Sequence, residues 1–203
     1  MYSPLTKQLI EALQKLPGIG QKSAQRMAFK LLTDAGKIQA NHLSNMLTQA
    51  TNAIGYCKSC RHFTESDLCP ICANAKRQTD LVCIVESPAD LVAINQTNQY
   101  NGVFYVLHGR LSPLDGIGPS ELGLEQMFER FKTSAVKEAI IATNSTMEGE
   151  ATAYYIAAKL KSLNIKASRI AHGVPIGGEL EYLDGNTLAH AFGNRAEILM
   201  NDD

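Results

Sequence analysis

The chain has 203 residues, enough to bury a core and to form one or two compact domains with small modules. Nineteen Lys plus Arg against twenty Asp plus Glu give a formal net charge of −1, so any contact with nucleic acid must be local. The first residues lack the basic and apolar regions of a secretory signal, and no apolar run reaches the roughly 18 residues of a membrane span. We therefore expect a soluble, cytoplasmic protein.

The first quarter of the chain is predicted to be a small helical module. Its apolar residues keep helical spacing in three groups: Leu5, Leu9, Ala12, Leu13 and Leu16; Ala24, Ala28, Leu31 and Leu32; Leu43, Met46, Leu47 and Ala50. Between the first two groups, residues 16–20 contain one proline, which cannot continue a helix, and two glycines, which permit a tight turn. The pattern predicts helix, glycine hairpin, helix.

This hairpin has the features of a grip on the DNA backbone. Gly18 and Gly20 let backbone N–H groups approach a phosphate, and the positive end of the following helix points the same way. Lys22 and Arg26 share one face of that helix at i, i+4 spacing. We predict that these four residues bind DNA without reading its sequence. The alternative interpretation is an ordinary helical hairpin with a solvated basic face.

Four of the five cysteines form two close pairs separated by eight residues. Cys57, Cys60, Cys69 and Cys72 can close a tetrahedral shell of thiolates around zinc, which leaves no open position and is typical of a structural site. We predict one structural zinc ion per chain; the alternative is four reduced thiols. Because the thiolates fill the shell, nearby His62 is interpreted as a surface residue.

After residue 80 the sequence predicts an α/β domain with a parallel sheet. Residues 81–85 and 139–142 are apolar runs without polar alternation, as expected for strands covered on both faces. Further strands are expected at 103–107 and 167–171, with helices near 88–96, 120–131 and 148–163. The tail contains a glycine-rich loop at 173–178, a helix from Thr187 and a short strand at 196–200. The whole chain is thus predicted to be α+β with several modules.

Acidic residues follow two of the predicted strands. Glu86 ends the strand at 81–85, and Ser87 can cap the next helix. Residues 144–150 follow the strand at 139–142 and include Glu148 and Glu150. Since open α/β sheets place ligands at the carboxyl ends of their strands, the three glutamates could converge on a divalent cation. Alternatively, Glu148 and Glu150 are simply favoured by the dipole of a first helical turn.

In this order the motifs resemble the RecR family of bacterial recombination mediators. Residues 16–26 look like its helix-hairpin-helix, and the four cysteines look like its zinc finger. Residues 86–88 with 148–153 resemble its Toprim domain, and 173–178 with the segment 181–184 resembles its C-terminal signature. The implied modules are 1–54 for DNA binding and oligomerisation, 55–76 for zinc, 79–174 for Toprim and 175–203 for oligomerisation.

The Toprim segment also resembles the catalytic domain of type IA topoisomerases and bacterial primases. Those enzymes carry an Asp-x-Asp pair before Glu-Gly-Glu, whereas this chain has Asn144 and Thr146 there and so loses two carboxylates for magnesium. We interpret Glu86, Asn144, Glu148 and Glu150 as a site that binds a partner or, weakly, magnesium, and does not cut. Tyr154 and Tyr155 are interpreted as packing residues in the core or an interface, not as nucleophiles. A magnesium-dependent nucleic-acid enzyme is the alternative.

The resemblance implies a job that depends on partners. Members act with RecO, and in some pathways RecF, to help load RecA onto single-stranded DNA coated by single-strand-binding protein. They form dimers and ring-like tetramers through their terminal regions. We therefore expect single-stranded or junction DNA, RecO and RecF as partners, and no membrane. The glycine-rich loop lacks the Gly-Lys-Ser/Thr ending of a P-loop, so ATP hydrolysis is not expected.

Overall fold

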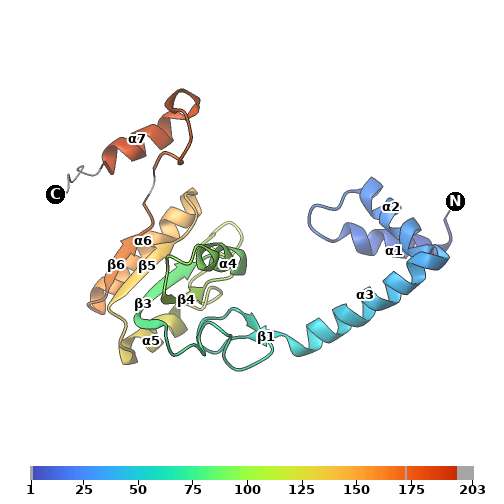
Figure 1. The fold of residues 1–203 in the computed structure, drawn as a ribbon, viewed down its shortest axis with the longest axis horizontal. Coiled ribbons are helices and arrows are strands. Elements are labelled where there is room, and N and C mark those ends of the chain that lie inside the picture. Colours follow the sequence, from blue (N-terminus) through green and yellow to red (C-terminus); the bar gives the residue numbers. More distant parts are fainter. Residues whose placement is uncertain (1, 172, 196–203) are drawn as a thin grey trace, which may run out of the picture. The chain divides into compact units, whose positions relative to one another are not determined.

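The computed structural model describes residues 2–171 and 173–195. Its contacts divide the chain into two compact units, Met1–Gly55 and Tyr56–Asp203 (Figure 1). The cysteine-rich segment therefore folds with the unit that follows it. Among the helices of residues 2–171 and 173–195, none combines the length and the apolar composition of a membrane span.

The first unit is helical, which confirms the prediction for this part of the chain. It contains α1 (Pro4–Gln14), α2 (Gln21–Leu32) and α3 (Asp34–Ala53). The small core holds Ile10, Ala24 and Ala28, packed against partly buried Leu9, Leu13 and Ile19. Ser3 and Thr33 cap α1 and α3 with side-chain oxygens that accept backbone N–H groups. Ile19, in the turn between α1 and α2, packs on this core and so holds the turn in place.

The second unit is built on a four-stranded sheet whose strands all run parallel. The strands are β3 (Gln78–Val85), β4 (Gly102–Val106), β5 (Glu138–Ala142) and β6 (Lys166–Arg169), in the order β4-β3-β5-β6. This confirms the predicted parallel sheet. The last strand ends at residue 169, two residues earlier than expected, and Ile170 is half exposed.

Helices cover the two faces of the sheet unequally. On one face, α5 (Leu124–Thr133) and α6 (Met147–Ser162) pack on the larger core cluster. On the other face, α4 (Pro88–Gln96) packs against β3 and β4 together with the cysteine-rich segment. The strand β5 was expected to be covered on both faces, but its burial alternates. This expectation was wrong because Ile140 and Ala142 are only partly buried on the α4 face.

The remaining elements are short. Before the sheet, β1 (Gly55–Tyr56) and β2 (Phe63–Thr64) form a two-stranded hairpin that the sequence pattern did not predict. After it come a single 3-10 turn, Leu180–Tyr182, and α7 (Gly185–Gly193). The helix begins two residues before Thr187 because the Asp184 carboxylate accepts the N–H groups of Asn186 and Thr187. The predicted strand at 196–200 lies outside the described residues.

Candidate functional site

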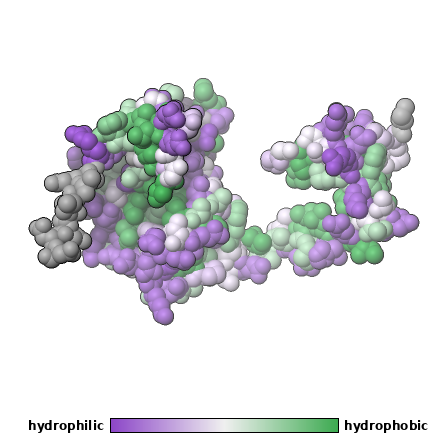
Figure 2. Space-filling view, turned by 45° about the horizontal axis from the view of Figure 1, so that its top comes forward, coloured by the Kyte–Doolittle hydropathy of each residue, from purple (hydrophilic) through white to green (hydrophobic). Residues whose placement is uncertain are grey.

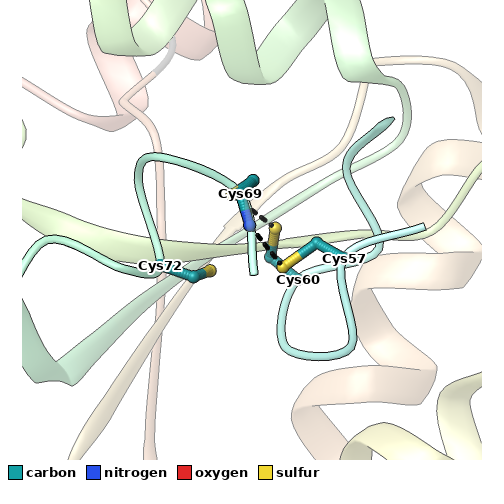
Figure 3. A group of neighbouring side chains, drawn as sticks. All are labelled: Cys57, Cys60, Cys69 and Cys72. Carbon is teal, nitrogen blue, oxygen red and sulfur yellow. Dashed lines mark hydrogen bonds between the residues drawn. The ribbon is translucent and has the colours of Figure 1, made fainter. Parts of the chain in front are cut away.

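The four paired cysteines converge on one point. Their sulfur atoms all lie within 4.8 Å of one another, and the sulfurs of Cys60 and Cys69 are 3.5 Å apart (Figure 3). A tetrahedral zinc site with bonds of about 2.3 Å requires sulfur–sulfur distances of about 3.8 Å. Backbone N–H groups also point at two sulfurs: Cys69 N lies 3.3 Å from the sulfur of Cys57, and His62 N lies 3.4 Å from that of Cys60. The donor set and its spacing fit a zinc ion.

The thiols are crowded enough to perturb one another. A hydrogen bond with Cys60 is the main cause that lowers the pKa of Cys72, to about 5. The same interaction, together with burial, raises the pKa of Cys60, and burial raises that of Cys69. Because like charges repel at this distance, the cluster cannot ionise fully without a compensating cation. Bound zinc would supply that charge and join the two cysteine pairs.

The cysteine-rich segment is bonded directly to the sheet. Val106 N in β4 donates to the carbonyl of Cys60 at 2.9 Å. The Arg61 guanidinium donates to the carbonyl of Leu122 and, at 3.5 Å, to that of Leu107. Sequence reasoning missed Arg61, because its acceptors are backbone carbonyls 46 and 61 residues away and carry no sequence signal.

The structure corrects the interpretation of one residue near the cluster, His62, and places another, Cys83. His62 is not a surface residue: it is half-buried, and its Nδ1 atom is buried without a hydrogen-bond partner among the described residues. The leftover Cys83 lies in β3, within the same core cluster as Cys57, Cys60 and Cys69. Burial raises the pKa of Cys83 to about 12, so its thiol is neutral and serves as a core residue.

The hairpin of the helical unit presents the predicted backbone donors and cations. Gly18 has φ +77°, a conformation that favours glycine, and Gly20 is the N-cap of α2 with no side chain to occupy the first N–H groups. Neither glycine has another atom within 4 Å of the position where a Cβ would lie. Lys22 and Arg26 are exposed on α2, and neither has an ion-pair partner in the described part of the chain.

The near-zero total charge conceals a basic helical unit. Residues 1–55 carry six Lys or Arg and only Glu11 and Asp34 as acids, a formal net charge of +4, which leaves −5 for residues 56–203. Lys7 pairs with Glu11 at 3.7 Å, and Lys37 pairs with Asp34 at 2.9 Å. Lys30, which no sequence motif singled out, lies one turn beyond Arg26 and extends the unpaired stripe on α2. Counting the charges of residues 1–55 separately would have revealed that this unit is basic.

The carboxyl ends of β3 and β5 meet at the point where the order of the strands reverses. Glu86 follows β3 and is only 5% exposed. Its two carboxylate oxygens accept from the backbone N–H of Asn144 at 2.8 Å and from the Asn144 side-chain amide at 2.7 Å. Open α/β sheets bind ligands in this crevice. Here both carboxylate oxygens of Glu86 already accept hydrogen bonds from Asn144.

The Glu-Gly-Glu motif packs tightly against this pair. A Cβ at Gly149 would lie 2.1 Å from the Asn144 carbonyl oxygen and 2.9 Å from a Glu86 carboxylate oxygen, so only glycine fits. The hydroxyl of Thr146 accepts the Gly149 N–H at 3.1 Å and caps α6. Thr146 thus serves the helix terminus, at a position where the topoisomerase and primase pattern has a carboxylate.

Glu148 and Glu150 lie in the first turn of α6 and face arginines. Glu150 forms a two-bond pair with Arg169 at the end of β6, and Glu148 lies 3.9 Å from Arg110. Within residues 2–171 and 173–195, the four cysteines are the one group of three or more potential ligands close enough to share an ion. The structure thus brings Glu86 to Asn144, and places Glu148 and Glu150 beside cations.

The two tyrosines of α6 have different surroundings. Tyr155 packs against the larger core cluster, with its ring centroid 6.5 Å from that of Phe128. Tyr154 is 73% exposed, so core packing does not describe it.

Comparisons with known proteins match every module of the chain in order. Family models match at residues 6–51 (RecR, helix-hairpin-helix), 54–74 (RecR, four-cysteine zinc finger domain), 80–171 (Toprim domain) and 173–195 (RecR, C-terminal). The recombination protein RecR of Coxiella burnetii is 59% identical over 198 residues, covering 98% of each chain. Those of Saccharophagus degradans and Xanthomonas campestris are 54% and 53% identical, covering 98% and 97% of this chain and 100% of each relative. The chain therefore belongs to the RecR family of recombination proteins.

Proposed function

We propose that this chain is a non-catalytic, DNA-binding mediator of recombinational repair. It acts with RecO and RecF to help load RecA onto single-stranded DNA coated by single-strand-binding protein. The family membership supports a role in recombination, and the unpaired basic stripe on α2 is the observation that carries the DNA-binding part. One structural zinc ion per chain holds the cysteine-rich segment. None of the five cysteines is in a disulfide, which suits the cytoplasm as the place of action.

The proposed DNA site consists of Gly18, Gly20, Lys22, Arg26 and Lys30. The open N-terminus of α2 offers backbone N–H groups to a phosphate, and the cations follow at one-turn intervals along the helix. The +4 charge of residues 1–55 adds attraction that the rest of the chain, at −5, does not. A site with only a few phosphate contacts has low affinity for DNA at physiological salt, so a single helical unit should bind DNA weakly.

Assembly into a dimer or ring-like tetramer would raise the affinity for DNA, because several helical units could bind the same molecule. Several apolar side chains are exposed on the helical unit: Leu16, Phe29, Leu32, Leu43, Met46 and Leu47. Figure 2 shows hydrophobic and hydrophilic patches next to one another on the surface. A groove of about 910 Å³ between α1, α2 and α3 is lined by several apolar residues and, along one border, by Arg26 and Lys30 of the proposed DNA site. The C-terminal segment also exposes Ile176, Leu180, Tyr182 and Phe192. Both surfaces suit contacts between copies of the chain.

The crevice at Glu86 supports a role without catalysis. Magnesium prefers several oxygen ligands with negative charge, but Glu86 is held by the amide of Asn144, and Glu150 by two hydrogen bonds from Arg169. A magnesium-dependent Toprim enzyme would need these carboxylates to be released together. We propose instead that Glu148 and Glu150, both partly exposed, contribute to binding a partner protein.

The experiment compares the full-length protein with Lys22→Ala and Arg26→Ala across a salt series, using labelled single-stranded DNA. On single-stranded DNA, each lost phosphate contact should make the slope of log K against log salt shallower by about 0.7 at each bound hairpin. Because the assembly repeats the change in every subunit, the affinity should fall by much more than one surface charge would cause. Solution mass confirms that assembly is intact. Unchanged affinity and slope in both variants would contradict the assignment of the DNA site.

A further inference from the structure

Three rings, two of them exposed and one partly buried, form a cluster at the edge of the cysteine-rich segment. Tyr56 and Phe63, from β1 and β2, stack with centroids 5.5 Å apart and planes at 28°. His108, just after β4, lies 4.9 Å from the Tyr56 ring and 5.4 Å from the Phe63 ring. We call Tyr56, Phe63 and His108 the aromatic platform. Tyr56 is 60% exposed and Phe63 is 48% exposed, although phenylalanine is among the residues most often buried.

The platform is held rigidly by the backbone beneath it. The His108 Nε2 atom lies 2.7 Å from the carbonyl oxygen of Arg61, which can only accept, so Nε2 carries the hydrogen. Arg61 and His108 both have positive φ, 64° and 60°, a region that residues other than glycine seldom adopt. Cys57 N donates to the His62 carbonyl at 2.8 Å and closes the loop between β1 and β2 that carries Cys57 and Cys60. Uncommon backbone conformations fixed by surrounding contacts concentrate at functional sites.

Charged side chains flank the rings. Lys58 and Arg110 each lie two residues from a platform residue and are exposed. Their partners, Asp67 at 2.7 Å and Glu148 at 3.9 Å, form exposed ion pairs of the kind that is worth little in water, so both cations can exchange to a phosphate. The unit as a whole has a charge of −5 and does not attract DNA broadly. A ligand here must therefore gain its affinity mainly from the rings.

We propose that the aromatic platform stacks an unpaired base of single-stranded DNA. Exposed aromatic faces beside cations are how sequence-independent single-strand binding is achieved, because every base has a flat face to stack. Duplex DNA has its bases already stacked and offers none. This inference rests on the proposed DNA-binding function, and it adds a second contact, distinct from the phosphate grip of α2, that discriminates single strands from duplex.

The test uses the absence of tryptophan from the chain. Tyr56→Trp keeps a flat ring on the platform and introduces the only indole, whose fluorescence a stacked base quenches. Full-length protein is titrated with a labelled single strand, a duplex of equal length and an abasic single strand, and binding is followed separately by anisotropy of the label. Tyr154→Trp, at an exposed tyrosine of α6, is the matched control.

We expect saturable quenching of the Tyr56→Trp signal by the single strand, and none by the duplex or the abasic strand. The Tyr154→Trp signal should stay unchanged. In the second measurement, Tyr56→Ala combined with Phe63→Ala should weaken single-strand binding roughly 5- to 150-fold with duplex binding unchanged. Tyr56→Phe should keep the wild-type affinity. Zinc content equal to that of the wild type confirms that the variants are folded.

The outcomes separate this inference from the function on which it rests. If anisotropy shows single-strand binding while the indole at position 56 is not quenched, or the double alanine variant binds normally, the platform does not stack bases and the phosphate grip stands alone. That result would leave the surface to a protein partner. If the wild type binds no DNA in any form or assembly, both the proposed function and the platform are overturned.

Discussion

The contact between Glu86 and Asn144 leads to a prediction that tests whether the crevice has a structural role or binds magnesium. Asn144→Asp replaces the amide that donates to Glu86 at 2.7 Å with a second carboxylate. Because Asn144 is exposed, the new carboxylate can turn toward water and escape most of the repulsion. What remains is the loss of one hydrogen bond to a buried charged group, about 1.5–3 kcal/mol.

That loss should lower the melting temperature of the unit containing residues 56–203 by roughly 3–12 °C, at about 2–4 °C per kcal/mol. Differential scanning calorimetry of the full-length protein at neutral pH measures it, and the transition of the helical unit should not move. Lower pH should reduce the loss, because a protonated carboxyl can donate again. Magnesium should stabilise Asn144→Asp more than the wild type, since a bound cation can draw the new carboxylate back toward that of Glu86 and be shared by both.

The matched control exchanges the two groups. Glu86→Gln combined with Asn144→Asp keeps one amide and one carboxylate in contact, and should recover most of the stability that Asn144→Asp loses. If Asn144→Asp melts at the wild-type temperature, or if the exchange restores nothing, the Glu86–Asn144 contact does not hold the crevice together. The non-catalytic assignment of the crevice would then lose its structural support.

Further predictions concern zinc, DNA and catalysis. Cys57→Ser should lose zinc and destabilise the sheet unit, because it removes one of the four ligands. Cys83→Ser should keep one zinc per chain, as measured by metal analysis. A wild-type protein that contains no metal in reducing buffer would contradict the zinc site. Lys30→Ala should weaken DNA binding and make its salt dependence shallower. Lys37→Ala removes a cation that is already paired with Asp34, so it should change the affinity and the salt dependence less. Equal effects of the two variants would contradict the assignment of the DNA site to the basic side chains of α2. Purified protein in magnesium should neither nick nor relax DNA, and activity abolished by Glu86→Ala would overturn the non-catalytic assignment.

The sequence alone determined the local features, because each depends on neighbouring residues. The spacing of Cys57, Cys60, Cys69 and Cys72 predicted a closed thiolate shell, and the structure brings the four sulfurs together. The glycine turn at residues 16–20 and the apolar periodicity around it predicted the helical hairpin. The basic character of residues 1–55 was also present in the sequence, but the sum over the whole chain hid it.

The tertiary structure decided which distant residues meet. Asn144 comes to Glu86 across 58 residues, and Arg169 comes to Glu150 across 19, so a row of acids that suggested a cation site is instead satisfied by the protein itself. The aromatic platform joins Tyr56 and Phe63 to His108, which follows a different strand. No periodicity or local spacing encodes these contacts, because they follow from the order of strands in the sheet and from the packing of the cysteine-rich segment against it.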